Sequence, residues 1–121
     1  MVKRKKTLAD EIAARLDAGK AEDIRVLDVR ELTSFADQMI IATGTSTRHV
    51  SALAHNLIRE LKKEHIVPFN DPKQSDGHWV VADFGVVIVH LFTAETRGLY
   101  DLETLWAPKS EHSRTIRRKS A

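Results

Sequence analysis

The 121-residue chain contains no cysteine, which excludes disulfide bonds, iron–sulfur clusters and cysteine-rich zinc sites. It also lacks any apolar run near the roughly 20 residues that a membrane-spanning helix needs. The opening MVKRKKTLADEI is basic, but no apolar segment follows it, so it does not have the pattern of a secretory signal. We therefore expect a cytoplasmic protein with no membrane partner.

The composition is that of a globular protein, with 42% hydrophobic and 30% charged residues. A chain of this length forms one domain and buries a core, but it has no room for a large ligand chamber.

Basic residues gather at the two ends of the chain. Residues 1–6 carry four of them and residues 109–121 carry five, with one acid in total, Glu111. The body, residues 7–108, keeps ten basic and sixteen acidic residues, a net charge of −6. We expect a folded α/β domain over 7–108, flanked by a basic N-terminal tail (1–6) and a basic, disordered C-terminal tail (109–121). Such tails either remain solvated or lie along nearby phosphates.

Hydrophobic spacing predicts three helices and five strands. Thr7 and Asp10 approximate a capping box, which starts a helix that Gly19 ends. A second, strongly amphipathic helix starts at Thr47, and a last one follows Thr93. The predicted strands cover residues 24–30, 38–43, 66–69, 78–82 and 86–92. This order favours an α/β fold with a mixed sheet of about five strands flanked by helices.

The predicted strand 86–92 (VVIVHLF) is apolar on both faces. A short chain has few helices to cover two sheet faces. Either helices flank both faces, or part of one face is left for a partner.

The segment TGTST, residues 43–47, lies where a buried strand meets a helix, a place where backbone amides can bind an anion. It has neither the GxGxxG of a dinucleotide fold nor the GxxxxGK[ST] of a P-loop. An ordinary turn at Gly44 with Ser46 or Thr45 as the helix cap explains these residues.

A nucleotidyltransferase is the enzymatic alternative, because that fold also places a glycine and a serine before a helix. It needs a pair of nearby carboxylates to hold two metal ions. Asp28 and Asp37 are single and separated, so the sequence offers no such pair. A nucleotide-binding or nucleotidyl-transferring enzyme that uses the Gly44 junction stays as the alternative function.

The histidines do not form a recognisable site. His49 and His55 lie on different faces of the predicted helix, which excludes a metal pair. His78 and His90 could be near neighbours across a hairpin, but two imidazoles without a third ligand make a weak zinc site. We predict no catalytic residues, no metal and no cofactor.

Five blocks of sequence occur together and in order: LDVRELTSFADQMIIATGTSTRHV, the amphipathic helix after it, DGHWVVADFG, VVIVHLF and ETRGLYDLETLW. Over about residues 7–106 they resemble the Iojap family, also called ribosomal silencing factor S. The resemblance implies a nucleotidyltransferase-like fold without catalytic residues, and so no small-molecule substrate.

The resemblance also implies a partner. Members of that family bind the large ribosomal subunit through its fourteenth protein and sterically block its association with the small subunit. This represses translation, and a role in subunit maturation is also attributed to the family. Members are homodimers when free. The basic tails would then lie near ribosomal RNA.

We expect the last two strands and the segment after them to carry partner binding, because they combine large amphipathic side chains with charge. These residues are Trp79, Val81, Asp83, His90, Phe92, Arg97, Tyr100 and Trp106. Phe92 and Trp106 could also belong simply to the core. A second matching block is expected mainly to shape the strand–helix junction: Asp28, Asp37, Gly44, Thr45, Ser46, Arg48 and His49.

Overall fold

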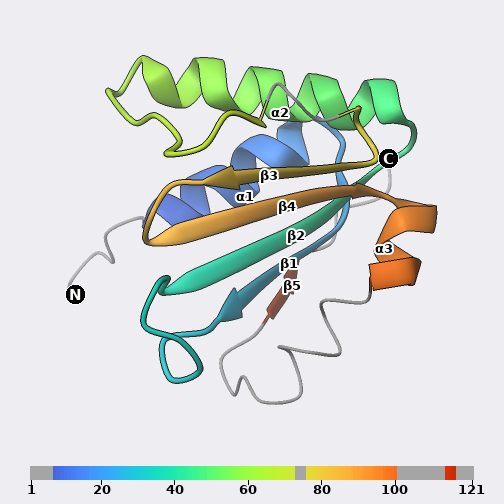
Figure 1. The fold of residues 1–121 in the computed structure, drawn as a ribbon. Helices are drawn as coiled ribbons and strands as arrows, with labels where there is room; N and C mark the ends of the chain where they lie inside the picture. Colours follow the sequence, from blue (N-terminus) through green and yellow to red (C-terminus); the bar gives the residue numbers. More distant parts are fainter. Residues whose placement is uncertain (1–6, 73–75, 101–113, 117–121) are drawn as a thin grey trace, which may run out of the picture.

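The computed structural model describes residues 7–72, 76–100 and 114–116 (Figure 1). The elements are α1 (Leu8–Ala18), β1 (Glu22–Asp28), β2 (Gln38–Gly44), α2 (Thr47–Lys62), β3 (Trp79–Asp83), β4 (Val87–Thr93), α3 (Ala94–Tyr100) and β5 (Arg114–Ile116). None of the helices in these ranges is long and apolar enough to span a membrane.

The strands form one mixed sheet in the order β3-β4-β2-β1-β5. β2 and β4 run parallel at its centre, with Ile40 opposite Val89. The other neighbours are antiparallel: β1 with β2, β1 with β5, and β3 with β4. The predicted mixed α/β class is therefore confirmed, with four strands of five to seven residues and a fifth of only three.

The fifth strand is not the predicted one. Ile66–Phe69 lies in the connection between α2 and β3, where Pro68 has no N–H to donate and His65 turns the chain with φ of 64°. Instead, Arg114–Ile116 forms β5 against Ile24–Val26 of β1. For these three residues the prediction of a disordered tail is wrong, because β1 offers an unpaired edge to them.

α1 and α2 cover the same face of the sheet, where they build the main core (Figure 1). The capping box is present at Thr7, and Ser46 caps α2 by accepting a hydrogen bond from the His49 N–H. α2 buries Val50, Leu53, Ala54, Leu57 and Leu61 against the strands. Because both long helices lie on one side, the sheet has a second face of different character.

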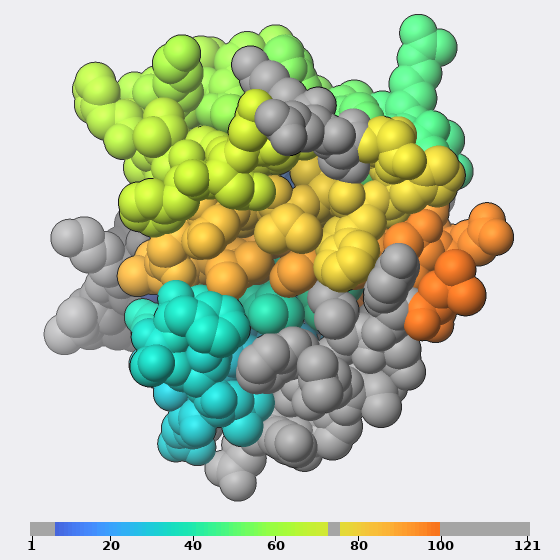
Figure 2. Space-filling model, in the orientation of Figure 1, coloured from blue at the N-terminus to red at the C-terminus, as the bar shows by residue number. Residues whose placement is uncertain are grey.

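This second face carries its own smaller apolar cluster, made of Leu27, Val29, Ala36, Met39, Ile41 and Phe92. Side chains of a strand alternate between faces, and Val80 and Ala82 belong to the main core. Trp79, Val81 and Asp83 of β3 therefore point to the second face, as do Ile88, His90 and Phe92 of β4. α3 lies at one end of the sheet in Figure 1. Neither α1 nor α2 covers the second face, and residues of β3 and β4 (yellow to orange) are visible on the molecular surface in Figure 2.

Gly44 ends β2 at a point of very close packing. A Cβ there would lie 2.7 Å from Val50 Cγ2 and 3.0 Å from the Val50 backbone nitrogen. Gly98 contrasts with it, because it lies within α3 and a Cβ there would meet nothing within 4 Å.

We predict opposite effects for the same change at these two glycines. Gly44→Ala should lower the free energy of unfolding by about 1–3 kcal/mol, because the α2 backbone must move to admit the methyl group. Gly98→Ala should raise it by up to about 1 kcal/mol through helix propensity. Urea denaturation of both variants measures this, and equal stability of the Gly44→Ala variant and the wild type would contradict the close packing.

Candidate functional site

Three rings gather on the second face where β3 and β4 pair. The Trp79 Nε1–H donates a hydrogen bond of 3.1 Å to His90 Nδ1. The rings of Trp79 and Phe92 stack with centroids 5.1 Å apart, and those of His90 and Phe92 with centroids 6.1 Å apart. The β3–β4 register sets this arrangement, because it places Trp79 opposite Phe92 and His90 two positions along. We call Trp79, His90 and Phe92 the aromatic cluster.

His90 is a buried polar residue of this cluster, with 8% of its surface exposed. Burial lowers the pKa of His90 to about 4, so the imidazole is neutral near pH 7. Since the indole nitrogen of Trp79 can only donate, His90 Nδ1 is the acceptor and Nε2 carries the proton. The centre of the cluster is thus uncharged and fixed in one tautomer, while half-buried Trp79 forms its accessible rim.

Asn70 closes the outer edge of β3. Its Nδ2 donates to the Val81 carbonyl at 2.6 Å, and its Oδ1 accepts from the Asp83 N–H at 2.9 Å. The Phe69 N–H donates to the Asp83 carbonyl at 2.7 Å. Asp83 Oδ1 in turn accepts from the Gly85 N–H at 2.8 Å, which holds the hairpin turn. These bonds occupy backbone groups that an edge strand would otherwise present to another chain.

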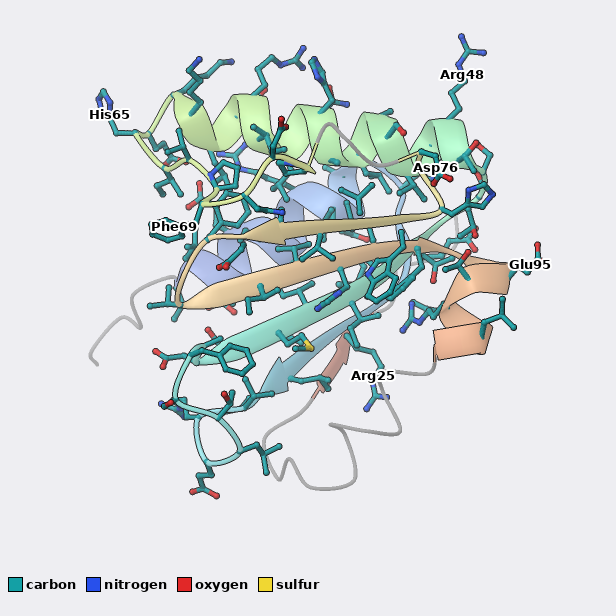
Figure 3. All side chains as sticks on the ribbon, in the orientation of Figure 1. Arg25, Arg48, His65, Phe69, Asp76 and Glu95 are labelled. Atoms are coloured by element: carbon teal, nitrogen blue, oxygen red, sulfur yellow. The ribbon has the colours of Figure 1, made fainter. Side chains whose placement is uncertain are left out.

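Two exposed apolar side chains that sequence reasoning did not select border the β3–β4 turn. Phe69 is 79% exposed and Val86 is 52% exposed. The Phe69 ring packs over Gly85, where a Cβ would lie 2.9 Å from Cε2. Figure 3 shows Phe69 at the end of the sheet remote from α3. No sequence pattern indicated this exposure, because residues 66–69 were expected to form a short strand at the sheet edge.

The other predicted partner-binding residues lie in different settings. Arg97 is tied into the fold: its Nη1 donates to the Asp23 carbonyl and to Thr43 Oγ1, both at 2.7 Å. It thereby joins α3 to β1 and β2 rather than extending into solvent. The side chain of Tyr100 and all of Trp106 lie outside the described residues.

The strand–helix junction at Gly44 is closed by its own side chains. His49 Nδ1 accepts a hydrogen bond from the Thr45 N–H at 2.9 Å, and its Nε2 donates to the Gly19 carbonyl at 2.9 Å. Ser46 Oγ accepts from the His49 N–H at 3.1 Å, while Arg48 extends outward. The Thr45 and His49 amides are thus used by the turn and the cap, as the simpler interpretation predicted.

The carboxylates and histidines do not assemble into a metal site in the described part of the chain, where no three candidate ligands gather. Asp28 forms an ion pair with Arg30. The idea that His78 and His90 are cross-strand neighbours is wrong, because His90 pairs with Val81 and His78 lies beside Asp76.

The fold and site define a small α/β protein with an aromatic cluster on one sheet face and a closed strand–helix junction. Comparison with known proteins adds the family. A family model described as ribosomal silencing factor during starvation matches residues 2–121. The chain belongs to this family.

Relatives agree with this assignment. A Haemophilus influenzae protein named ribosomal silencing factor RsfS is 44% identical over 83% of this chain and 98% of its own. A mouse protein named mitochondrial assembly of ribosomal large subunit protein 1 is 36% identical over 84% of this chain and 50% of its own. A crystal structure of a Chromobacterium violaceum protein superposes with a TM-score of 0.78 at 32% identity, covering 98% of this chain and 92% of that one.

We predict that His90 makes stability depend on pH. Its folded-state pKa of about 4 lies below the value near 6.5 of an unfolded chain, so the unfolded state takes up a proton first. The free energy of unfolding should therefore fall by up to about 3 kcal/mol as the pH drops from about 6.5 to 4. In urea denaturation across this range, His90→Gln should show a shallower fall. His55→Gln, which replaces an exposed histidine, is the control, and equal slopes in all three proteins would contradict the assignment.

We also predict that nucleotides do not stabilise the fold. A ligand that binds the folded state raises the melting temperature with saturation. Because the Thr45 amide is already bonded, ATP or GTP with Mg²⁺ should leave the melting temperature unchanged in a thermal shift measurement. A concentration-dependent rise that is abolished in Gly44→Ala would instead support the enzymatic alternative.

Proposed function

We propose that this chain is a non-catalytic, cytoplasmic silencing factor that binds the large ribosomal subunit through its fourteenth protein. Bound at the intersubunit face, it blocks association with the small subunit and so represses translation. The family assignment supports the ribosomal role. The aromatic cluster on the second face is the main observation that supports the proposed location of the binding site.

The aromatic cluster suits a protein interface. Half-buried Trp79 offers a large rigid surface, and Phe92 and His90 hold it in place from behind. Aromatic anchors of this kind contribute most of the binding energy at many interfaces. Val81 and Asp83 continue the surface along β3. Exposed Phe69 and Val86 extend it at the hairpin turn, adding apolar area that water would otherwise cover.

Charge supports the choice of a ribosomal protein as partner. The body of the chain, residues 7–108, carries a net charge of −6, and ribosomal proteins that contact RNA are basic. Complementary charge raises the association rate. The basic tails would contact ribosomal RNA beside the docking site, because their positive charge is attracted to phosphates.

Repression by this route requires occupancy and no chemistry. A bound domain holds apart two surfaces that must come into contact, so it competes directly with subunit association. The same occupancy protects an unfinished large subunit from early joining, and we include a role in subunit maturation for this reason. The name of the mouse relative refers to assembly of the large subunit, which supports that part of the proposal.

In the unbound state, the second face would be covered by a second copy of the chain. A homodimer of this kind would cover the exposed part of Trp79 and would have to dissociate for the ribosome to bind. Self-association and ribosome binding would then exclude each other.

The test is cosedimentation of the purified protein with isolated large and small ribosomal subunits. We expect one copy to bind the large subunit alone and to inhibit subunit joining. Trp79→Ala should weaken binding about 30-fold, as loss of an interface anchor worth about 2 kcal/mol does. Binding to neither subunit at moderate salt would overturn the proposal.

Two further variants separate binding from folding. Trp79→Phe keeps the stacked ring but removes the donor to His90, so it should retain the fold and lose only part of the affinity. Val67→Ala trims another exposed apolar side chain, in the connection after α2, and should bind like the wild type. Circular dichroism of each variant confirms that it is folded. Equal weakening in Val67→Ala and Trp79→Ala would place the interface elsewhere.

A further inference from the structure

We propose that the outward face of α2 binds single-stranded RNA, with phosphates along a basic ridge and one base in the hollow beside it. The ridge consists of Arg48, His55, Arg59 and Lys62. None of these residues belongs to the basic tails or to the second face. The choice of RNA rests on the proposed function, since a protein on the large subunit is surrounded by RNA.

Helix geometry places the ridge residues in one line. At 100° per residue, Arg48, His55, Arg59 and Lys62 fall within about 60° of one another around the axis. The buried side chains of α2, such as Leu57, occupy the opposite side. From Arg48 to Lys62 the ridge extends about 21 Å. In Figure 3 Arg48 projects away from the sheet, as expected for this face.

The positive charge of the ridge is not neutralised in the described part of the chain. There the structure records no ion pair for Arg48, Arg59 or Lys62. Arg59 only donates a hydrogen bond of 3.1 Å to Asn56 Oδ1. The single acid of α2, Glu60, lies off the ridge and pairs with Lys63 at 3.1 Å. An unpaired line of cations on a body of net charge −6 is suited to a polyanion.

A hollow adjoins the ridge, and its size and lining indicate which kind of polyanion fits. It has a volume of about 410 Å³ and lies between α2, Pro72 and Val80. Ala54, Ile58, Pro72 and Val80 give it an apolar lining, while Ser51, His55, Arg59 and Lys62 provide polar groups. An unstacked base has an apolar face of suitable size and is linked to a phosphate. A duplex keeps its bases paired and cannot fill the hollow, so the site favours a single strand.

The two binding sites lie on opposite sides of the molecule. The ridge points away from the sheet, whereas the aromatic cluster lies on the sheet face that α1 and α2 leave uncovered. RNA on α2 and a protein on the second face can therefore bind at the same time. The two contacts can also be tested separately.

Fluorescence anisotropy with a labelled single-stranded RNA of about eight nucleotides tests the proposal at several salt concentrations. Arg59→Gln combined with Lys62→Gln should weaken binding about tenfold and reduce the slope of log affinity against log salt by about 1.4. The control combines Arg25→Gln with Arg30→Gln, which removes the same charge from the β1 side of the sheet. It should change the affinity less than about twofold. Arg59→Lys should bind almost as well as the wild type.

Three results would overturn the proposal. Equal weakening in the ridge variant and the control would show that overall charge, and no particular site, attracts RNA. Equal affinity for duplex RNA would show that no unpaired base occupies the hollow. Binding of polyglutamate in place of RNA would identify an acidic protein as the partner. Since the assay uses RNA alone, its outcome does not depend on whether the protein cosediments with the large subunit.

Discussion

The parallel pairing of β2 with β4 is the constraint on which the rest of the structure depends. Two parallel neighbours cannot be joined by a tight turn, so the chain between them must cross the sheet. That crossing contains α2 and β3. α2 packs on the same face as α1, and β3 returns as the edge strand beside β4. One pairing therefore decides which face is covered by helices and which strand carries Trp79.

The same constraint explains why the two proposed binding regions differ in chemistry. The second face is built from alternate residues of strands, which set rings side by side at fixed register. The ridge is built from one stripe of a helix whose opposite stripe is committed to the core. Rings held rigidly suit a shaped protein surface, while long cationic side chains on a helix suit a phosphate chain. The proposed protein contact and the proposed RNA contact thus lie on different kinds of secondary structure.

Much of this could be predicted from the sequence, because periodicity and caps are local signals. The capping box at Thr7, the cap at Ser46 and four of the strands were predicted close to where they lie. The strand at 66–69 was wrong, since a short apolar run with a proline fits an edge strand and a loop equally well. β5 could not be predicted, because three residues in a basic segment become a strand only when β1 offers an edge.

The contacts of the candidate site residues could not be predicted for a similar reason. Large amphipathic side chains and charge select residues but do not say what those residues contact, so Trp79 was grouped with Arg97 from the sequence. The structure separates them, as one belongs to the aromatic cluster and the other ties α3 to β1 and β2. Exposed Phe69 was missed because its exposure depends on a turn that no local pattern encodes.

The closure of β3 by Asn70 has a consequence for how recognition can change over time. A partner that adds a strand to a sheet is held by backbone groups, which all sequences share, so it is discriminated weakly. Here Asn70 already holds the Val81 carbonyl and the Asp83 amide. The side chains of the second face must therefore distinguish one partner from another. Such a surface can follow changes in its partner through single substitutions that leave the fold unaltered.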